Sequence, residues 1–378
     1  MIKARGKPDT ILLILVIILV LFGIVMVFSA SYYSTITADA GPYHYLILAA
    51  QWALAGFGVM CLAILVPYRV YYILAPVLII FSLILLILLF TPVGEEINNA
   101  RRWIQIGELT FMPGEFAKVA VIIGCAWYYT KYADKIKTFG RGFFAIAVLA
   151  VLYFYLIYKQ PNLSTAIIVL LTIIAMMFIS GVRVGYLLGT LVAGGIGIYY
   201  MINVNQGEHL SRISGYLDPF SDAQGEFFQT VQGLLALGSG GLTGVGLGNS
   251  VEKALWLPYA QNDFIFAIIG EETGFIGCIL ILVGFVILIW RCMLIAMRSK
   301  DRFALLLAGG VGMLFAIQVA MNIGVVTNIL PPTGVILPFI SYGGNAIIVF
   351  MFLIGIVLNI SRGDGIEAEV EQSVEEAA

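Results

Sequence analysis

Charged side chains are scarce in this chain of 378 residues. Asp, Glu, Lys and Arg together make up 11% of it, whereas 61% is hydrophobic. The net charge of −2 gives no basic face of the kind that binds DNA or RNA, so we predict no nucleic-acid partner. A mean hydropathy of +1.01 excludes an ordinary soluble domain and indicates a membrane protein.

Cysteine and histidine are also rare. The cysteines lie far apart and mostly within apolar segments, which favours small core residues over a disulfide or a metal site: Cys61, Cys125, Cys278 and Cys292. The two histidines, His44 and His209, lie in different loops. The sequence therefore predicts no metal site.

Long apolar segments are what the chain has in abundance. Runs of about 18 or more apolar residues indicate transmembrane helices, because roughly 20 residues cross the hydrocarbon core. The pattern predicts an all-α, polytopic membrane protein with about ten transmembrane helices, at residues 11–30, 45–66, 70–91, 116–131, 143–159, 162–180, 184–204, 264–290, 303–328 and 335–360. The first run follows basic residues and lacks a convincing small-residue cleavage site, so we expect a membrane helix rather than a removable signal peptide.

The basic residues indicate the orientation of these spans. With both termini in the cytoplasm, most lysines and arginines fall on the cytoplasmic side, as the positive-inside rule requires: Lys3, Arg5, Lys7, Arg69, Lys131, Lys135, Lys137, Arg141, Arg183, Arg291, Arg298, Lys300, Arg302 and Arg362. A large extracytoplasmic loop, about 205–263, then separates spans seven and eight. We expect residues 1–362 to form a single transmembrane domain, and the glutamate-rich segment 363–378 to be a disordered cytoplasmic tail.

The middle of the large loop is half-apolar and rich in glycine. The stretch "FFQTVQGLLALGSGGLTGVGLGNS" is typical of an interfacial helix followed by a loop that enters the protein. A nucleotide-binding Gly-x-Gly turn is the weaker alternative, because no predicted strand precedes it.

Several ionisable residues gather near the outer ends of the predicted spans. Such groups are costly at membrane depth and are candidates for function: Arg101, Arg102, Glu115, Lys118, Lys253, Asp263, Glu271 and Glu272. The cations have the chemistry to bind a phosphate or diphosphate. The alternative is that they pair with the acids and hold loops together. Glu115 and Lys118, three residues apart, share one helix face.

The three acids of "LPYAQNDFIFAIIGEETGFIG" (257–277) differ in depth. Asp263 starts a helix after Pro258, so it either caps that helix or acts as a general base. Glu271 lies eight residues further on, about 12 Å deeper along a helix. At that depth Glu271 and Glu272 are better suited to holding a buried cation or polar network than to reacting.

A second unusual stretch is "NIGVVTNILPPTGVILPFISYGG" (322–344). Its prolines and the pair Gly343–Gly344 break helices at the outer ends of spans nine and ten. Broken helices at this depth either line a cavity, where freed backbone donors can bind an anionic headgroup, or form a kinked packing joint. Both alternatives stay open on physical grounds.

Four separated stretches resemble motifs of the SEDS family of shape, elongation, division and sporulation proteins, in the family's order. They are "RRWIQIGELTFMPGEFAK" (101–118), "DPFSDAQGEFFQTVQGLLALGSGGLTGVGLGNS" (218–250), the 257–277 stretch and "LPPTGVILPFISYGG" (330–344). The resemblance covers nearly the whole chain, and it is closer to the FtsW/SpoVE division-type branch than to RodA.

The resemblance implies a peptidoglycan glycosyltransferase of the cytoplasmic (inner) membrane, with its active site outside. Members of the family polymerise lipid II into β-1,4 glycan strands. The implied partners are a class B penicillin-binding protein transpeptidase and, for a role in septal wall synthesis, other divisome proteins. A divalent cation, Mg²⁺ or Mn²⁺, is a conceivable helper at the diphosphate, although no carboxylate cluster specifies one.

By resemblance, Asp263 is the essential catalytic carboxylate. The substrate-binding residues implied by the motifs are Arg102, Glu115, Lys118, Lys253, Ser341, Tyr342 and Gly343, with Trp103, Glu271 and Glu272 as structural support. The chain departs from the family in having Met112 and Gly114 around Pro113, Gln261-Asn262 before the aspartate, and Asn345 after the glycine pair.

Two rival functions fit a membrane protein of this size. A lipid II flippase needs polar groups through the whole bilayer depth, whereas the unusual charges here gather near the outer side. A scaffold that only recruits a transpeptidase should tolerate substitution of Asp263. Within the family, a RodA-like elongation polymerase is the alternative to a division enzyme.

Overall fold

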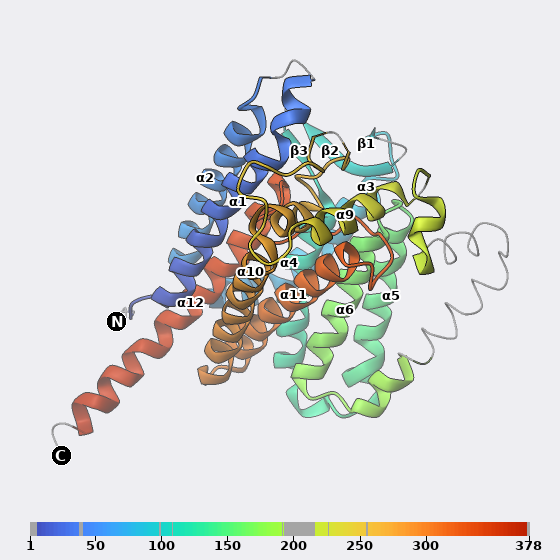
Figure 1. Cartoon of the computed structure of the whole chain (residues 1–378). Helices are drawn as coiled ribbons and strands as arrows, with labels where there is room; N and C mark the ends of the chain where they lie inside the picture. The colour runs from blue at the N-terminus through green and yellow to red at the C-terminus, as the bar shows by residue number, and fades with distance from the viewer. Residues whose placement is uncertain are drawn as a thin grey trace.

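A bundle of long helices makes up most of the molecule (Figure 1). The computed structural model describes residues 6–375 apart from 38–40, 98–99, 108, 191, 193–215, 226 and 255. Its principal helices are α1 (Thr10–Thr37), α2 (His44–Leu65), α3 (Tyr68–Leu88), α4 (Pro113–Lys131), α5 (Ala145–Tyr158), α6 (Leu163–Ser180), α9 (Phe228–Ser239), α10 (Ile265–Arg298), α11 (Arg302–Val326) and α12 (Gly344–Glu375).

Eight of the described helical segments are long and apolar enough to cross a membrane. They correspond to predicted spans one, two, three, five, six, eight, nine and ten. The fourth predicted span is α4, a 19-residue helix that carries Glu115 and Lys118 in its first two turns and is buried over most of its length. The seventh, 184–204, lies largely outside the described residues, as do His209 and Arg212. The total of ten spans therefore stays a prediction.

The fold is helical, as predicted, and it contains one small sheet that the sequence did not indicate. Part of the outer segment 92–115 forms a three-stranded antiparallel sheet in the order β1 (Gly94–Ile97), β2 (Ala100–Ile106), β3 (Leu109–Phe111). The sheet lies at the end of the bundle opposite the two termini (Figure 1). Pro113 begins α4 one residue after β3, and its fixed φ and missing N–H favour this first helical position.

The tenth predicted span starts later than expected. Residues 331–337 have no regular structure and 338–340 form a turn, and α12 begins only at Gly344. Pro338 and the glycine pair favour such non-helical backbone, which is tolerated at membrane depth where protein surrounds it. At its other end α12 continues to Glu375, so its backbone is helical over most of the segment predicted to be a tail. A division of the chain at residue 362 stays a prediction.

Helix α10 is interrupted at Gly274, whose φ of 69° is accessible mainly to glycine. The glycine-rich loop 240–246 supplies the missing hydrogen bonds. Val245 and Gly246 donate their N–H groups to the carbonyls of Glu271 and Glu272, at 2.9 and 3.1 Å. In return, the N–H groups of residues 275 and 276 donate to the carbonyls of residues 241 and 242. This exchange fixes the loop that leads to Asp263 against α10.

Candidate functional site

A cavity of about 480 Å³ lies among the ends of four helices and the sheet. It contains seven of the residues singled out from the sequence, namely Arg102, Trp103, Glu115, Lys118, Asp263, Tyr342 and Gly343. Other parts of the wall come from α2, α6, α11, the start of α12 and the non-helical segment 334–336. Arg102 and Gly343, which are 241 positions apart in sequence, thus line the same cavity.

The helix ends that meet here are all N-termini. Residues at the starts of α4, α6, α10 and α12 line the cavity. Each helix N-terminus carries roughly half an elementary positive charge and unpaired N–H groups. Their convergence makes the cavity favourable for an anion without requiring many charged side chains.

Strand β2 separates its two arginines by the alternation of a pleated strand. Arg101 points to the exposed side and pairs with Glu96 at 3.0 Å, with about half of each side chain exposed. Arg102 faces the cavity, where its guanidinium donates to the carbonyl of Pro161, and Trp103 also lines the cavity. Partial burial lowers the pKa of Arg102 from its usual value. Arg102 is therefore the arginine placed to meet a bound anion.

Glu115 and Lys118 form a buried ion pair on the first turns of α4. The Lys118 ammonium donates to Glu115 Oε1 at 2.7 Å and to Gln318 Oε1 at 3.4 Å, and it lies 5.6 Å from the centre of the Phe350 ring. Glu115 already offsets much of the lysine's charge. The pair is thus a polar wall of the cavity, and Arg102 is the cation with more capacity left for a ligand.

Asp263 lies two residues before the start of α10, at the end of the loop that is hydrogen-bonded to that helix. Asn322 of α11 holds its backbone by donating to the Asp263 carbonyl at 2.8 Å, and the same amide group donates to Val335 at 2.6 Å. Within the described part of the chain, no lysine or arginine forms a salt bridge with the Asp263 carboxylate. Burial raises its pKa to about 6, although a hydrogen bond from its own backbone works in the opposite direction.

Gly334 lies on the opposite side of this carboxylate. A Cβ at Gly334 would lie 3.9 Å from Asp263 Oδ2, and the φ of 72° disfavours any other residue there. The aspartate therefore faces bare backbone and open cavity rather than a neutralising partner. Such a carboxylate is suited to accept a proton from a bound hydroxyl.

Lys253 does not line this cavity. Its ammonium is buried and donates to Glu272 Oε1 at 2.5 Å and to Ser29 Oγ at 2.9 Å. Glu271 accepts from the hydroxyl of Ser250 at 2.5 Å and from the N–H of Val251 at 2.7 Å. These groups join the loop to α1 and α10. The geometry thus fits a structural assignment for Glu271 and Glu272, and it gives Lys253 the same kind of position rather than the substrate-binding one expected from sequence.

The "SYGG" residues divide between two positions. The Ser341 hydroxyl accepts from the N–H of Leu337 at 2.8 Å, which closes a turn in the non-helical segment, and this residue lies outside the large cavity. Tyr342 lines the cavity, and its ring packs edge-on against Tyr45, with 4.9 Å between centroids. Gly343 lines it at the start of α12.

Sequence reasoning missed the polar residues that connect these parts. Gln318 and Asn322, both almost fully buried, lie four residues apart on one face of α11. Gln318 donates to the Ile336 carbonyl at 3.0 Å, so both amides hold the segment 335–336. Two polar residues at this spacing in an apolar span were a readable signal. Asn162, which caps α6 in the same cavity, was missed as well.

The cavity offers few ligands for a resident metal ion. Among the described residues, no three His, Cys, Asp or Glu side chains come together. The two carboxylates that line the cavity are Asp263 and Glu115, and the latter is paired with Lys118.

Comparison with known proteins gives a consistent answer over almost the whole chain. A family model described as "Cell cycle protein", FtsW/RodA/SpoVE, matches residues 9–365. A probable peptidoglycan glycosyltransferase FtsW of Trichlorobacter lovleyi is 38% identical over 363 residues, which cover 95% of this chain and 94% of the relative. Stage V sporulation protein E of Bacillus subtilis is 36% identical over 362 residues, covering 95% and 98%.

Solved structures agree. A structure described as "Structural coordination of polymerization and crosslinking by a peptidoglycan synthase complex" contains a chain that is 26% identical, with a TM-score of 0.81 over 94% of this chain and 98% of that one. The rod shape determining protein RodA of Thermus thermophilus is 25% identical, with a TM-score of 0.68 over 94% and 97%. The chain therefore belongs to the FtsW/RodA/SpoVE family of cell cycle proteins.

Proposed function

We propose that this protein is a peptidoglycan glycosyltransferase that polymerises lipid II into β-1,4 glycan strands, with Asp263 as the general base. The observation on which this rests most is a buried carboxylate with a pKa of about 6, in a cavity formed by four helix N-termini. A base poised near the operating pH and an environment favourable to a leaving anion are the two requirements of this transfer.

In the proposed reaction, the 4-hydroxyl oxygen of the acceptor sugar attacks the anomeric carbon of the donor sugar. Asp263 takes the proton of that hydroxyl. The bond between the anomeric carbon and the diphosphate oxygen breaks, and undecaprenyl diphosphate leaves with the bonding electrons. One displacement inverts the configuration at the anomeric carbon, which converts an α-linked donor into a β-linked strand.

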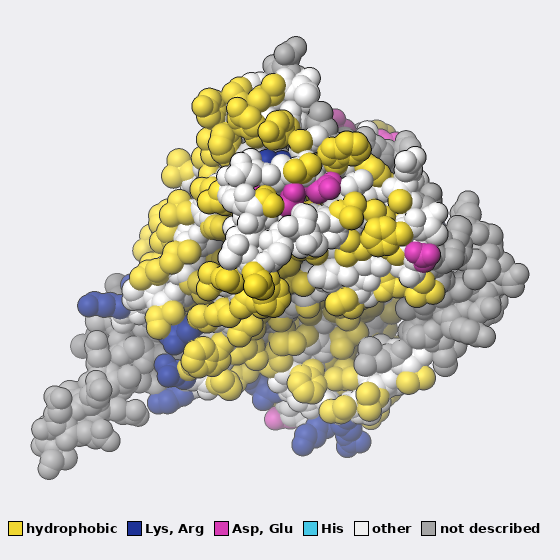
Figure 2. Space-filling model, viewed as in Figure 1, with side chains coloured by type: hydrophobic (Ala, Val, Ile, Leu, Met, Phe, Trp, Pro, Cys, Tyr) yellow, Lys and Arg dark blue, Asp and Glu magenta, His cyan; other side chains and the backbone are white. Residues whose placement is uncertain are grey.

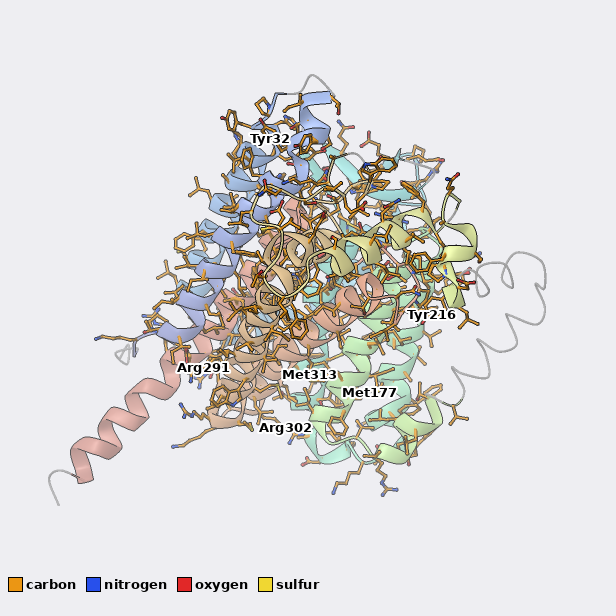
Figure 3. All side chains as sticks on the ribbon, viewed as in Figure 1. Tyr32, Met177, Tyr216, Arg291, Arg302 and Met313 are labelled. Carbon is orange, nitrogen blue, oxygen red and sulfur yellow. The ribbon has the colours of Figure 1, made fainter. Side chains whose placement is uncertain are left out.

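The charge distribution supports an outward-facing site. In Figure 2 most of the visible Lys and Arg side chains gather at the lower end, where the chain termini also lie in Figure 1. Arg291 and Arg302 lie toward that end and Tyr32 lies at the opposite one (Figure 3). With the positively charged end in the cytoplasm, the sheet and the loop that leads to Asp263 lie on the outer side of the membrane. We propose both termini inside and, counting the seventh span, ten spans in the cytoplasmic membrane.

The same assignment names the partners. Lipid tails of donor and acceptor would remain in the bilayer while their headgroups occupy the cavity. We propose a class B penicillin-binding protein as the transpeptidase that crosslinks the new strands, because the similar solved structure is described as coordinating polymerization with crosslinking. The relatives named FtsW favour division and contact with other divisome proteins over elongation.

A divalent cation such as Mg²⁺ or Mn²⁺ would have to arrive with the diphosphate. The described residues do not supply a cluster of three ligands for it. We therefore assign no step of the reaction to a metal ion. In the proposed reaction, Arg102 and the helix N-termini stabilise the negative charge of the departing diphosphate.

The test is polymerisation of purified lipid II in liposomes, by the protein alone and with its cognate transpeptidase, read as glycan strands on a gel. Strands are expected, at least with the partner. If none form while lipid II crosses to the opposite leaflet of the liposomes, the flippase is the correct function. If neither occurs but the transpeptidase is bound, the protein is a scaffold.

A further inference from the structure

The segment between α4 and α5 combines basic and aromatic side chains at the positively charged end of the molecule (Figure 1, Figure 2). Residues 131–144 contain one acid, Asp134, and four exposed basic residues, namely Lys131, Lys135, Lys137 and Arg141. Among the described residues, no acid forms a salt bridge with any of the four. The segment therefore presents positive charge that the described part of the chain does not neutralise.

Three arginines at the same end of the molecule are used by the protein itself. Arg291 forms a salt bridge with Asp9. Arg302 and Arg362 donate to backbone carbonyls of other segments, at 3.1 and 3.2 Å. The preference for positive charge on the cytoplasmic side explains the sign of the charge in 131–144, but it does not explain why these side chains lack such partners.

Aromatic rings position two of the cations. The Lys131 ammonium lies 4.9 Å from the centre of the Trp127 ring and 5.6 Å from the centre of the Tyr132 ring. The Arg141 guanidinium carbon lies 5.7 Å from the centre of the same Tyr132 ring. Cation–π contacts orient a cation but do not neutralise it. Lys131 and Arg141 are therefore held by one shared ring, and their charge is available to a ligand.

The backbone of the segment is fixed against α4. The hydroxyls of Tyr128 and Tyr129 donate to the carbonyls of Arg141 and Gly142, at 2.8 and 3.0 Å. A Cβ at Gly142 would clash with the carbonyl oxygen of Ile136, so this close turn requires glycine. A site that is fixed before its ligand arrives loses less conformational entropy on binding.

The same segment leads into the membrane. One of the helical segments that can cross a membrane begins at Phe139, and the side chains of Phe139 and Phe144 are 55% and 53% exposed. Arg141 lies between them in the sequence. Exposed rings beside basic residues are typical of the level of the lipid headgroups, where an apolar body contacts acyl chains and a charged end stays at the surface. The chemistry thus favours a ligand that joins an anion to an apolar chain.

We propose that residues 131–144 bind an anionic phospholipid of the cytoplasmic leaflet, with Lys131 and Arg141 on its phosphate and the two exposed phenylalanines against its acyl chains. A phosphate accepts hydrogen bonds from both an ammonium and a guanidinium, and basic clusters next to a membrane helix attract anionic lipids. The rival ligand is an acidic protein, which would leave the exposed phenylalanines without a role. The proposal is independent of glycosyl transfer and uses only the proposed orientation, with this end in the cytoplasm.

The test measures the dissociation constants of dioleoyl phosphatidylglycerol and of zwitterionic dioleoyl phosphatidylcholine for the purified protein in mild detergent, by native mass spectrometry. The unmodified protein should bind the anionic lipid more tightly. Lys131→Gln/Arg141→Gln should bind phosphatidylglycerol about 25-fold more weakly, because each basic residue near an anionic headgroup contributes about fivefold in affinity, and should bind phosphatidylcholine unchanged. Tyr132→Leu keeps both charges and should give a smaller loss for the same lipid.

The matched control is Lys7→Gln/Arg298→Gln. Both residues are exposed, they lie toward the same end of the molecule, and the change in charge is identical. This variant should bind both lipids as the unmodified protein does. If the first double variant does not fold, Lys135→Gln/Lys137→Gln makes the same change of charge within the segment, and the same selective loss is expected.

Three results would overturn the proposal. Equal affinity of the unmodified protein for the two lipids would show that no site for an anionic lipid exists. An equal loss in the segment variant and in the control variant would show that overall charge attracts the lipid. Binding of a polyglutamate peptide through Lys131 and Arg141, without a preference for phosphatidylglycerol, would show that the segment binds an acidic protein instead.

Discussion

The buried pair of Lys253 and Glu272 provides the sharpest test of how the loop carrying Asp263 is held. The two charged atoms lie 2.5 Å apart, and the side chains are 2% and 0% exposed. Replacing Lys253 by Met leaves Glu272 buried, and among the described residues its side chain then keeps only the Ser29 hydroxyl, at 2.7 and 2.9 Å, as a donor. Removing one partner of a buried pair costs about 3–5 kcal/mol, and the remaining hydroxyl places our expectation near the lower limit, about 3 kcal/mol.

The double variant Lys253→Met/Glu272→Gln removes both charges and keeps a polar partner for Ser29. We expect its free energy of unfolding to return to within about 1 kcal/mol of the unmodified protein. Arg101→Met/Glu96→Gln is the control, because that pair is about half exposed and is worth about 0–1 kcal/mol.

The assay is unfolding in mixed micelles by a denaturing detergent, followed by tryptophan fluorescence. A Lys253→Met protein as stable as the unmodified one would refute the reasoning, and so would a double variant less stable than the single one. The double variant should also polymerise lipid II, because Lys253 lies outside the cavity. Loss of polymerisation by this folded variant would instead restore Lys253 as a substrate ligand.

Three further predictions concern the cavity and its support. The polymerisation rate should fall below about pH 6, because the raised pKa of Asp263 leaves its carboxyl protonated and unable to accept a proton there; a flat profile between pH 5 and 7.5 would contradict this. Asn322→Leu removes the amide that donates to the carbonyls of Asp263 and Val335. In steady-state assays kcat should therefore fall by about tenfold to a hundredfold, with KM little changed. An unchanged kcat would exclude a positioning role for Asn322. Gly274→Ala should lower the free energy of unfolding by at least about 2 kcal/mol, because its Cβ would lie 2.3 Å from the Gly244 nitrogen at a φ of 69°. Gly58→Ala is the control, since a Cβ there meets nothing within 4 Å. It should be neutral or stabilising in the same unfolding assay.

Hydropathy predicted most of the spans because the bilayer sets the length of an apolar helix. It failed at the start of α12, where the apolar segment before Gly344 has no regular structure up to residue 337 and forms a turn at 338–340. It also missed the sheet, since strands as short as β2 give no signal in a window suited to membrane helices. The alternation of Arg101 and Arg102 between exposed surface and cavity was visible only once β2 was known.

The candidate site was predicted where charge and helix breaks coincided. Asp263, Arg102 and Glu115 come together as expected, because each lies at the same depth in its own segment. The depth of a residue in the membrane could not predict the position of Lys253, which lies outside the cavity and pairs with Glu272. Nor could it give the convergence of four helix N-termini, a property of packing that no single segment contains.

The central claim is that Asp263 takes the proton of the attacking hydroxyl. The most direct measurement is the rate of strand formation from lipid II by unmodified protein and by Asp263→Asn, each with the cognate transpeptidase, at matched amounts of folded protein. Asn has nearly the same size and cannot act as a base at neutral pH. We expect strands from the unmodified protein and at least about a hundredfold slower formation by the variant. Equal rates from a folded Asp263→Asn protein would contradict the account.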